Sequence, residues 1–114
     1  MLKNEPILEK EKVEKLKSQL ICDEEIYDIS DFFKVFGDST RLKILWTLDG
    51  NKLSVNDLCN VVGITKSAAS HQLNILKDNK LVKFERSGKN IFYSLEDEHV
   101  SLIIETARQH LWEK

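Results

Sequence analysis

Residues 54–79 have the pattern of two short helices joined by a turn that contains glycine. Ser54 can cap the first helix, which ends at Gly63, and Thr65 can cap the second, which runs to about Asn79. Two helices joined in this way are the helix-turn-helix pattern. The segment therefore predicts a small helical domain with this motif at its centre.

A β-hairpin is expected directly after these helices, over residues 81–95. The runs LVKFER and NIFYSL are rich in β-branched and aromatic residues, and they flank Ser87-Gly88-Lys89. Such runs on either side of a glycine-containing turn are typical of two antiparallel strands. A helix-turn-helix followed by a two-stranded hairpin is a winged helix-turn-helix, so we predict a mainly α fold with one β-hairpin.

Helical signals dominate the rest of the chain, and no linker or repeat divides it. Its 114 residues leave room for one domain, so we expect a single domain over residues 1–114. A domain of this size has a thin core, and pairing with a second copy through the amino- and carboxyl-terminal helices would add burial. The expected helices are an amino-terminal helix or arm over residues 1–28, a segment that stops at Gly37, a helix from Asp38 or Ser39 to Asp49, and a last helix over residues 97–112.

Composition also limits where the protein acts. No apolar run approaches the roughly 20 residues that span a bilayer, and the amino-terminal stretch MLKNEPILEKEK is charged where a signal peptide would be apolar. We therefore expect a cytoplasmic protein with no membrane partner. Cys22 and Cys59 lie far apart, so no disulfide framework is expected. We expect Cys59 to be buried as a small apolar residue, and we assign Cys22 no role.

The charges are unevenly distributed along the chain. The formal net charge is −2, but residues 65–90 carry six basic and two acidic side chains, a local charge of +4. Residues 1–32 carry five basic and nine acidic side chains, and residues 91–114 carry two and five. A basic segment between acidic ends can bind a phosphate backbone whatever the total charge. An ordinary solvated surface is the alternative.

The helix from Thr65 has two different faces. Ala69, Leu73 and Leu76 form a stripe toward the core, and the opposite face carries short polar side chains that can reach base edges and phosphates. These side chains and the basic residues of the hairpin predict DNA binding, although small polar residues can also simply face water. The expected DNA-binding residues are Ser67, Ser70, His71 and Asn74, Gln72 at the edge of that face, where a tilted helix would bring it to an adenine, and Lys66, Arg86 and Lys89 on the DNA backbone.

The last helix carries four candidate metal ligands: Asp97, His99, His110 and Glu113. His99 and His110 are three helical turns apart, so both imidazoles lie on nearly the same face, about 16 Å apart along the axis. Ligands of one zinc ion lie only about 4 Å apart, so a single helix cannot assemble the site. Two antiparallel copies of the helix would join the Asp97/His99 end of one to the His110/Glu113 end of the other. The alternative is that both histidines are ordinary surface residues.

The segments FGDSTRLKILWTL and VNDLCNVVGITKSAASHQLNILKDNKLVKFERSGKNIFYSL resemble the ArsR/SmtB family, over roughly residues 29–114. The resemblance implies a homodimer that represses transcription from an inverted-repeat operator until an inducer binds. The zinc-sensing branch carries the same Asp-x-His and His-x-x-Glu pattern on this helix. Family members that sense soft metals through thiols carry Cys-x-Cys where this chain has Ser54 and Asn56, so the thiolate site is expected to be absent.

We therefore predict a metal-sensing repressor that holds double-stranded DNA as a metal-free homodimer and is released by Zn(II), with Co(II) or Cd(II) as substitutes. One alternative is a metal-independent or thiol-responsive DNA-binding regulator; zinc binding by the wild type and not by a His110 variant would separate the two. Another is a zinc enzyme, which is disfavoured because four protein ligands leave no position for water and no G-x-S-x-G or H-E-x-x-H motif occurs.

Overall fold

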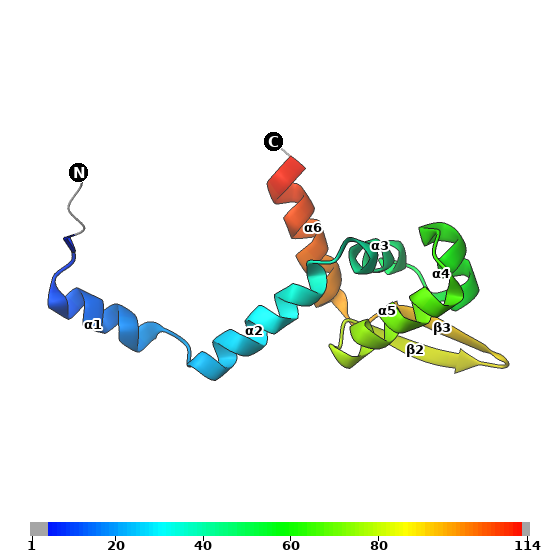
Figure 1. The fold of residues 1–114 in the computed structure, drawn as a ribbon, viewed down its shortest axis with the longest axis horizontal. Coiled ribbons are helices and arrows are strands. Elements are labelled where there is room, and N and C mark those ends of the chain that lie inside the picture. The colour runs from blue at the N-terminus through cyan, green and yellow to red at the C-terminus, as the bar shows by residue number, and fades with distance from the viewer. Residues whose placement is uncertain (1–4, 113–114) are drawn as a thin grey trace. The chain divides into compact units, whose positions relative to one another are not determined.

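The structure is a computed structural model that describes residues 5–112, and these form a mainly helical chain with a small antiparallel sheet (Figure 1). The chain divides into two compact units, residues 1–31 and residues 32–114. The predicted winged helix-turn-helix is confirmed in the second unit. The elements in order are α1 (Lys10–Gln19), α2 (Asp23–Phe36), α3 (Ser39–Leu48), β1 (Leu53–Ser54), α4 (Val55–Val62), α5 (Lys66–Asp78), β2 (Val82–Ser87), β3 (Asn90–Leu95) and α6 (Glu98–Trp112).

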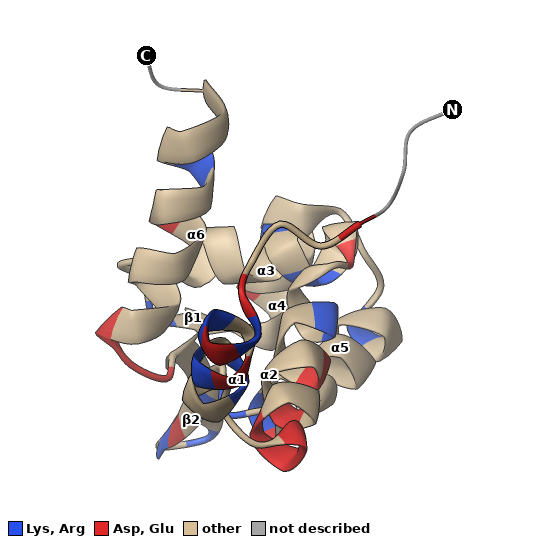
Figure 2. Ribbon diagram, turned by 90° about the vertical axis from the view of Figure 1, so that its left-hand side faces the viewer, with Lys and Arg blue, Asp and Glu red and all other residues tan. Residues whose placement is uncertain are grey.

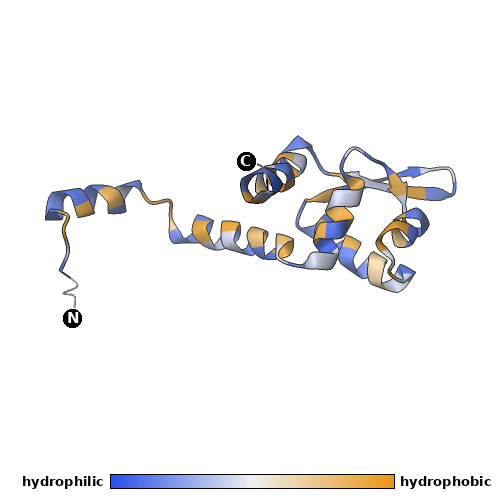
Figure 3. Ribbon diagram, turned by 90° about the horizontal axis from the view of Figure 1, so that it is seen from above, coloured by the Kyte–Doolittle hydropathy of each residue, from blue (hydrophilic) through white to orange (hydrophobic). Residues whose placement is uncertain are grey.

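The first unit holds α1 and the beginning of α2. Where one helix or arm is predicted over residues 1–28, the structure has two helices, because α1 ends at Gln19 and α2 begins at Asp23. No residue of α1 is buried within the chain, although Leu16 and other apolar side chains recur along it. Apolar and polar residues also alternate along α2 (Figure 3). Both helices therefore carry apolar surface that the chain itself leaves exposed.

The core lies in the second unit, where α3, α4, α5 and the sheet pack together. Each of these elements contributes side chains with almost no exposed surface, and the predicted stripe of α5 is among them. The fully buried residues include Ile44, Leu45 and Leu48 from α3, Leu58 from α4, Ala69, Leu73 and Leu76 from α5, and Leu81 and Val82 at the start of the hairpin. α5 therefore has one side fixed by the core, which leaves the other for recognition.

Local capping determines where the three central helices begin. Asp38 Oδ1 accepts a hydrogen bond from Arg41 N at 3.0 Å, and the hydroxyls of Ser54 and Thr65 accept from backbone N–H groups three residues later. Each bond satisfies a donor that the first helical turn leaves unpaired. α4 ends at Val62, and Gly63 follows as its C-cap with a φ of +79°, the left-handed conformation that favours glycine. All three predicted caps are confirmed.

The sheet has three strands in the order β1-β3-β2, one more than the predicted hairpin. In the added pairing, Leu53 lies opposite Tyr93 and Ser54 opposite Phe92. A strand of two residues is too short to show alternation in the sequence, and its partner lies far along the chain. The β2–β3 turn follows the prediction, because Ser87 pairs with Asn90 and Gly88 has a φ of +63°.

Two further details differ from the sequence analysis or complete it. Cys59 was expected to be buried and is only half-buried, whereas its neighbour Leu58 is fully buried. Cys22 is exposed just before α2. Among residues 5–112, no helix combines the length and the apolar character needed to cross a membrane.

Candidate DNA interface and metal-ligating residues

The outer face of α5 presents polar side chains to solvent. Ala69, Leu73 and Leu76 are fully buried on the inner side, so the rotation of the helix about its axis is determined by the core. Thr65 caps the amino-terminal end, where Ala68 keeps the helix narrow. Besides Lys66 at its start, four predicted DNA-binding residues with short polar or imidazole side chains are exposed on this helix: Ser67, Ser70, His71 and Asn74. We call these four side chains the recognition face.

The hairpin carries the second predicted group of DNA-binding residues. Arg86 lies in β2, Lys89 lies in the turn, and both are exposed. Figure 2 shows basic residues on the hairpin and on α5. Glu85, the one acidic residue of β2, forms an ion pair with Lys52 at 3.1 Å. No ion pair recorded for residues 5–112 involves Arg86 or Lys89, so the hairpin presents positive charge.

A cavity of about 230 Å³ brings Lys66 of α5 and Lys89 of the turn together with Ser54, Asn56 and Asn90. In the sequence, Ser54 is predicted as a helix cap, Ser54 and Asn56 are positions without cysteine, and nothing singles out Asn90. The β1–β3 pairing explains the arrangement, because it lays the start of α4 beside the carboxyl-terminal strand of the hairpin. Two lysines with amide and hydroxyl groups are suited to a phosphate oxygen. No local pattern in the sequence could have revealed this juxtaposition.

Gln72 differs from the recognition face because it is half-buried and already bonded. Its Oε1 accepts a hydrogen bond from Arg41 Nη1 at 3.2 Å. Gln72 therefore lies at the edge of the polar face, and the oxygen of its amide is hydrogen-bonded to another residue of the protein. Arg41 was missed by the sequence analysis, since it belongs to α3 and nothing near it in sequence indicates Gln72 as its partner.

At the start of α6, the structure places two of the predicted metal ligands together. Asp97 immediately precedes the helix, which begins one residue later than the predicted range, and its Oδ1 accepts a hydrogen bond from His99 N at 2.9 Å. The same oxygen lies 3.4 Å from His99 Nδ1, and the side chains of His99 and Asp97 are 87% and 50% exposed. For bond lengths near 2.05 Å, two ligand atoms of a tetrahedral zinc lie about 3.3 Å apart. The donor types and their separation therefore fit zinc.

The other two predicted ligands are not brought to this pair. His110 lies in the last turn of α6 and is exposed, and Glu113 falls outside the described residues. His99 and His110 are separated by about 16 Å of helical rise. Within residues 5–112 of one chain, no group of three or more His, Cys, Asp or Glu side chains is placed to hold a metal ion. Any site that uses both ends of α6 therefore needs a second copy.

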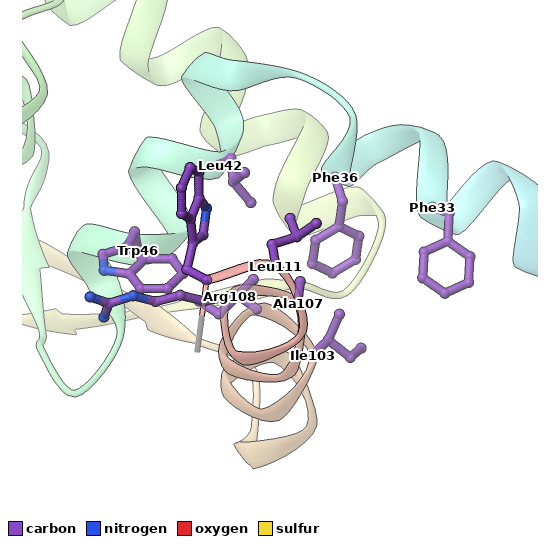
Figure 4. A pocket seen from close by; sticks show the side chains of 10 residues that line it. Phe33, Phe36, Leu42, Trp46, Ile103, Ala107, Arg108 and Leu111 are labelled. Atoms are coloured by element: carbon purple, nitrogen blue, oxygen red, sulfur yellow. The ribbon is translucent and has the colours of Figure 1, made fainter. Parts of the chain in front are cut away.

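An apolar hollow of about 400 Å³ lies between α6, α3 and the end of α2 (Figure 4). Phe33 and Phe36 come from α2, Trp46 from α3, and Ile103 and Leu111 from α6. Several of these side chains are largely exposed, and Leu111 keeps 71% of its surface accessible. The hollow is a mainly apolar surface of the second unit, and it shares α6 with the candidate metal ligands.

Comparison with known proteins relates this architecture to one family. Residues 38–83 match the family described as bacterial regulatory protein, arsR family. Over 110 residues the chain is 33% identical to the transcriptional repressor SmtB homolog of Synechocystis sp., with 96% of this chain and 83% of that protein covered. It is 35% identical over 104 residues to the cadmium resistance transcriptional regulatory protein CadC homolog of Staphylococcus aureus, with 90% and 85% covered.

Solved structures agree with these sequence relatives. NolR from Sinorhizobium fredii has a TM-score of 0.74 at 28% identity, with 83% of this chain and 97% of NolR covered. Reduced HlyU from Vibrio cholerae has a TM-score of 0.71 at 27% identity, with 79% and 95% covered. The family consists of regulators and not of enzymes, which removes the zinc-enzyme alternative. The chain belongs to the ArsR family of bacterial regulatory proteins, the family that its sequence motifs resemble.

Proposed function

We propose that the protein is a cytoplasmic, metal-responsive transcriptional repressor. It binds an inverted-repeat DNA operator as a homodimer, and its affinity for DNA falls when zinc binds between the two copies. The observation that carries the proposal is the make-up of α6. This helix has the Asp97–His99 pair at one end, His110 at the other, and the apolar hollow along its side.

DNA binding is supported by the recognition face and the hairpin. The core determines which side of α5 is exposed, and that side carries hydroxyl, amide and imidazole groups of the kind that contact base edges. Lys66 and Lys89 share a cavity suited to a phosphate, and Arg86 adds charge on the same hairpin. Base contacts from the helix would supply sequence specificity, while the basic residues would supply affinity and orientation.

A second copy is the occupant we assign to the apolar hollow. Residues of α6 line the hollow. The candidate ligands at the two ends of α6 can come together only if α6 of a second copy lies antiparallel to it across a two-fold axis. Phe33, Leu111 and Trp112 are each more than half exposed in the single chain, a concentration of aromatic and aliphatic surface typical of the core of an interface. The homodimer would bury these side chains and present two recognition faces to two DNA half-sites.

Zinc is the metal that suits the proposed donor set. Asp97 and His99 of one copy would act with His110 and Glu113 of the other, two imidazoles and two carboxylates in all. Ser54 and Asn56 supply no thiolate, which disfavours a soft-metal site at α4. When bound, the ion would link the α6 helices of both copies. The metal and the DNA would then influence each other, because each would favour a different arrangement of the same dimer.

The test is a metal titration of the DNA-bound protein by fluorescence anisotropy. The probe is a labelled duplex that the metal-free protein has itself selected from a random-sequence pool. Zinc should weaken binding by roughly 5- to 150-fold, the usual range of allosteric coupling. His110→Ala should bind the duplex normally without metal and fail to respond to zinc, whereas Gln109→Ala, an exposed neighbour, should respond like the wild type.

Two results would contradict the proposal. One is a wild-type complex that is unchanged by zinc, cobalt, nickel and cadmium alike. The other is a His110→Ala variant that still releases DNA with zinc. If only cadmium releases the DNA, the inducer is cadmium and not zinc, and Cys22 and Cys59 become candidate ligands.

A further inference from the structure

One guanidinium group joins three helices of the second unit. Arg41 is the third residue of α3, and its side chain is only 17% exposed. Its Nε donates to the backbone carbonyl of Val35 at 2.9 Å, near the end of α2. Its Nη1 donates to Gln72 Oε1 on α5 at 3.2 Å. The Asp38 carboxylate, which caps α3, lies 3.9 Å away. Arg41 therefore holds α5 and the end of α2 at once.

The chemistry of these bonds depends on arginine. The carbonyl of Val35 belongs to the last turn of α2, where carbonyl groups lack a partner within the helix. The planar guanidinium offers donors in fixed directions, so it can reach this carbonyl and the Gln72 amide together. A lysine has the same charge but one compact ammonium group and no such fork. Replacing Arg41 by lysine therefore separates the geometry of the contact from its charge.

The bond to Arg41 engages one end of the Gln72 amide. Oε1 is engaged by Arg41, and no hydrogen bond is recorded for Nε2 among residues 5–112. An adenine edge would require Gln72 to donate and accept at the same time. After the bond to Arg41, Oε1 keeps a second lone pair and Nε2 keeps its donors, so the amide can donate to an acceptor atom on DNA.

We propose that Arg41 is a positioning residue for DNA recognition that acts through Gln72. It fixes the amide so that Nε2 donates to an acceptor atom on the DNA, and it links α5 to the end of α2. Fixing the side chain in advance lowers the entropy lost when DNA binds. The inference rests on the proposed binding of DNA by α5 and adds a residue that does not itself touch DNA.

The test is a double-mutant cycle on the full-length, metal-free protein. Arg41→Lys, Gln72→Ala and the double variant are titrated with the selected duplex and with a scrambled duplex of equal length. Gln72→Ala should bind the selected duplex about tenfold more weakly, and Arg41→Lys several-fold more weakly. The double variant should bind no more weakly than Gln72→Ala alone, because both changes remove one coupled contact. The salt dependence should stay unchanged, since neither change removes a charge.

Controls separate this role from a structural one. Lys43→Ala removes an exposed charge from the same helix and should keep the wild-type affinity. Gln72→Ala places a good helix former on α5, so this variant tests the contact even if Arg41→Lys folds poorly. A loss limited to the selected duplex identifies a base acceptor as the partner of Nε2, and an equal loss on both duplexes identifies a phosphate oxygen.

Three outcomes overturn the inference. If the losses of the single variants multiply in the double variant, Arg41 does not act through Gln72. If thermal melting of Arg41→Lys shifts while its affinity stays at the wild-type value, the contact only stabilises the fold. If the wild-type protein binds no duplex at all, the proposed function itself is wrong. If the wild type binds the selected duplex and the Arg41 and Gln72 variants bind it equally well, only this inference is wrong.

Discussion

At the scale of single residues, the two parts of the DNA interface differ in what they can recognise. The recognition face consists of short side chains with donor and acceptor groups, which suit base edges. Arg86 and Lys89 are long and positively charged, and they lie on a hairpin whose acidic residue, Glu85, is paired with Lys52. Charge of this kind interacts with phosphates of any sequence. The hairpin should therefore govern affinity and not specificity.

Replacing Arg86 or Lys89 by alanine tests this division. Each change should weaken binding by a similar factor on the selected and the scrambled duplex, because one phosphate is no longer neutralised. The slope of log K against log salt should fall in magnitude by about 0.9 for each such phosphate. Anisotropy titrations over a salt series measure both effects, and Lys10→Ala in α1 is the control. If affinity and slope are unchanged in both variants, the hairpin does not contact DNA.

At the scale of elements, α6 serves the fold in its first half and presents free surface in its second. Val100 and Ile104 are buried in the chain's own core, whereas Leu111, farther along the helix, is 71% exposed. Figure 4 shows Leu111 beside Phe36 of α2, and both line the hollow. The second half of α6 is therefore available to a second copy without disturbing the fold of the first.

A charge at Leu111 should separate the two copies. In a symmetric dimer Leu111→Glu removes two buried leucines, each worth about 1.5–3 kcal/mol, so the dimer dissociation constant should rise by roughly a hundredfold or more. The melting of the single chain should change little, since the side chain is exposed there. Gln109→Glu adds the same charge on another side of the helix and should leave the dimer intact. Sedimentation equilibrium measures the constant, and an unaffected dimer in Leu111→Glu would remove the hollow from the interface.

At the scale of the whole molecule, the proposed metal site exists only in the dimer. One chain brings Asp97 and His99 to within ligand distance of each other, but His110 lies about three helical turns away. Two copies related by two-fold symmetry would have two identical sites, each built from both chains. Metal binding would then depend on how the two copies are arranged, whereas binding at a site within one chain would not.

Mixing two defective chains tests the shared site. A His99→Ala chain and a His110→Ala chain each form homodimers in which every site lacks one histidine. In the mixed dimer, one site has all four ligands and the other lacks both imidazoles. Tight zinc binding at one equivalent per dimer should therefore appear only after mixing, as calorimetry would show. If the mixture binds zinc no better than either parent, the metal does not bridge the two copies.

What the sequence alone determined is local in character. The caps at Asp38, Ser54 and Thr65 each involve a bond over three residues, so the chain order itself reveals them. The buried stripe of α5 follows from helical periodicity, which also predicts the exposed face. The spacing of His99 and His110 likewise follows from the pitch of a helix. These patterns were sufficient for the fold and for most of the candidate DNA interface.

What only the tertiary structure decided involves residues far apart in the chain. Arg41 and Gln72 are 31 residues apart, and Leu53 pairs with Tyr93. The cavity that joins Lys66 to the hairpin depends on this same pairing. Such contacts arise from how the helices and the sheet pack around one core. This packing produces no periodic pattern of residues along the sequence. For this reason the sequence indicated which side chains can meet DNA, while the folded chain showed that one of them, Gln72, is already bonded to a residue of another helix.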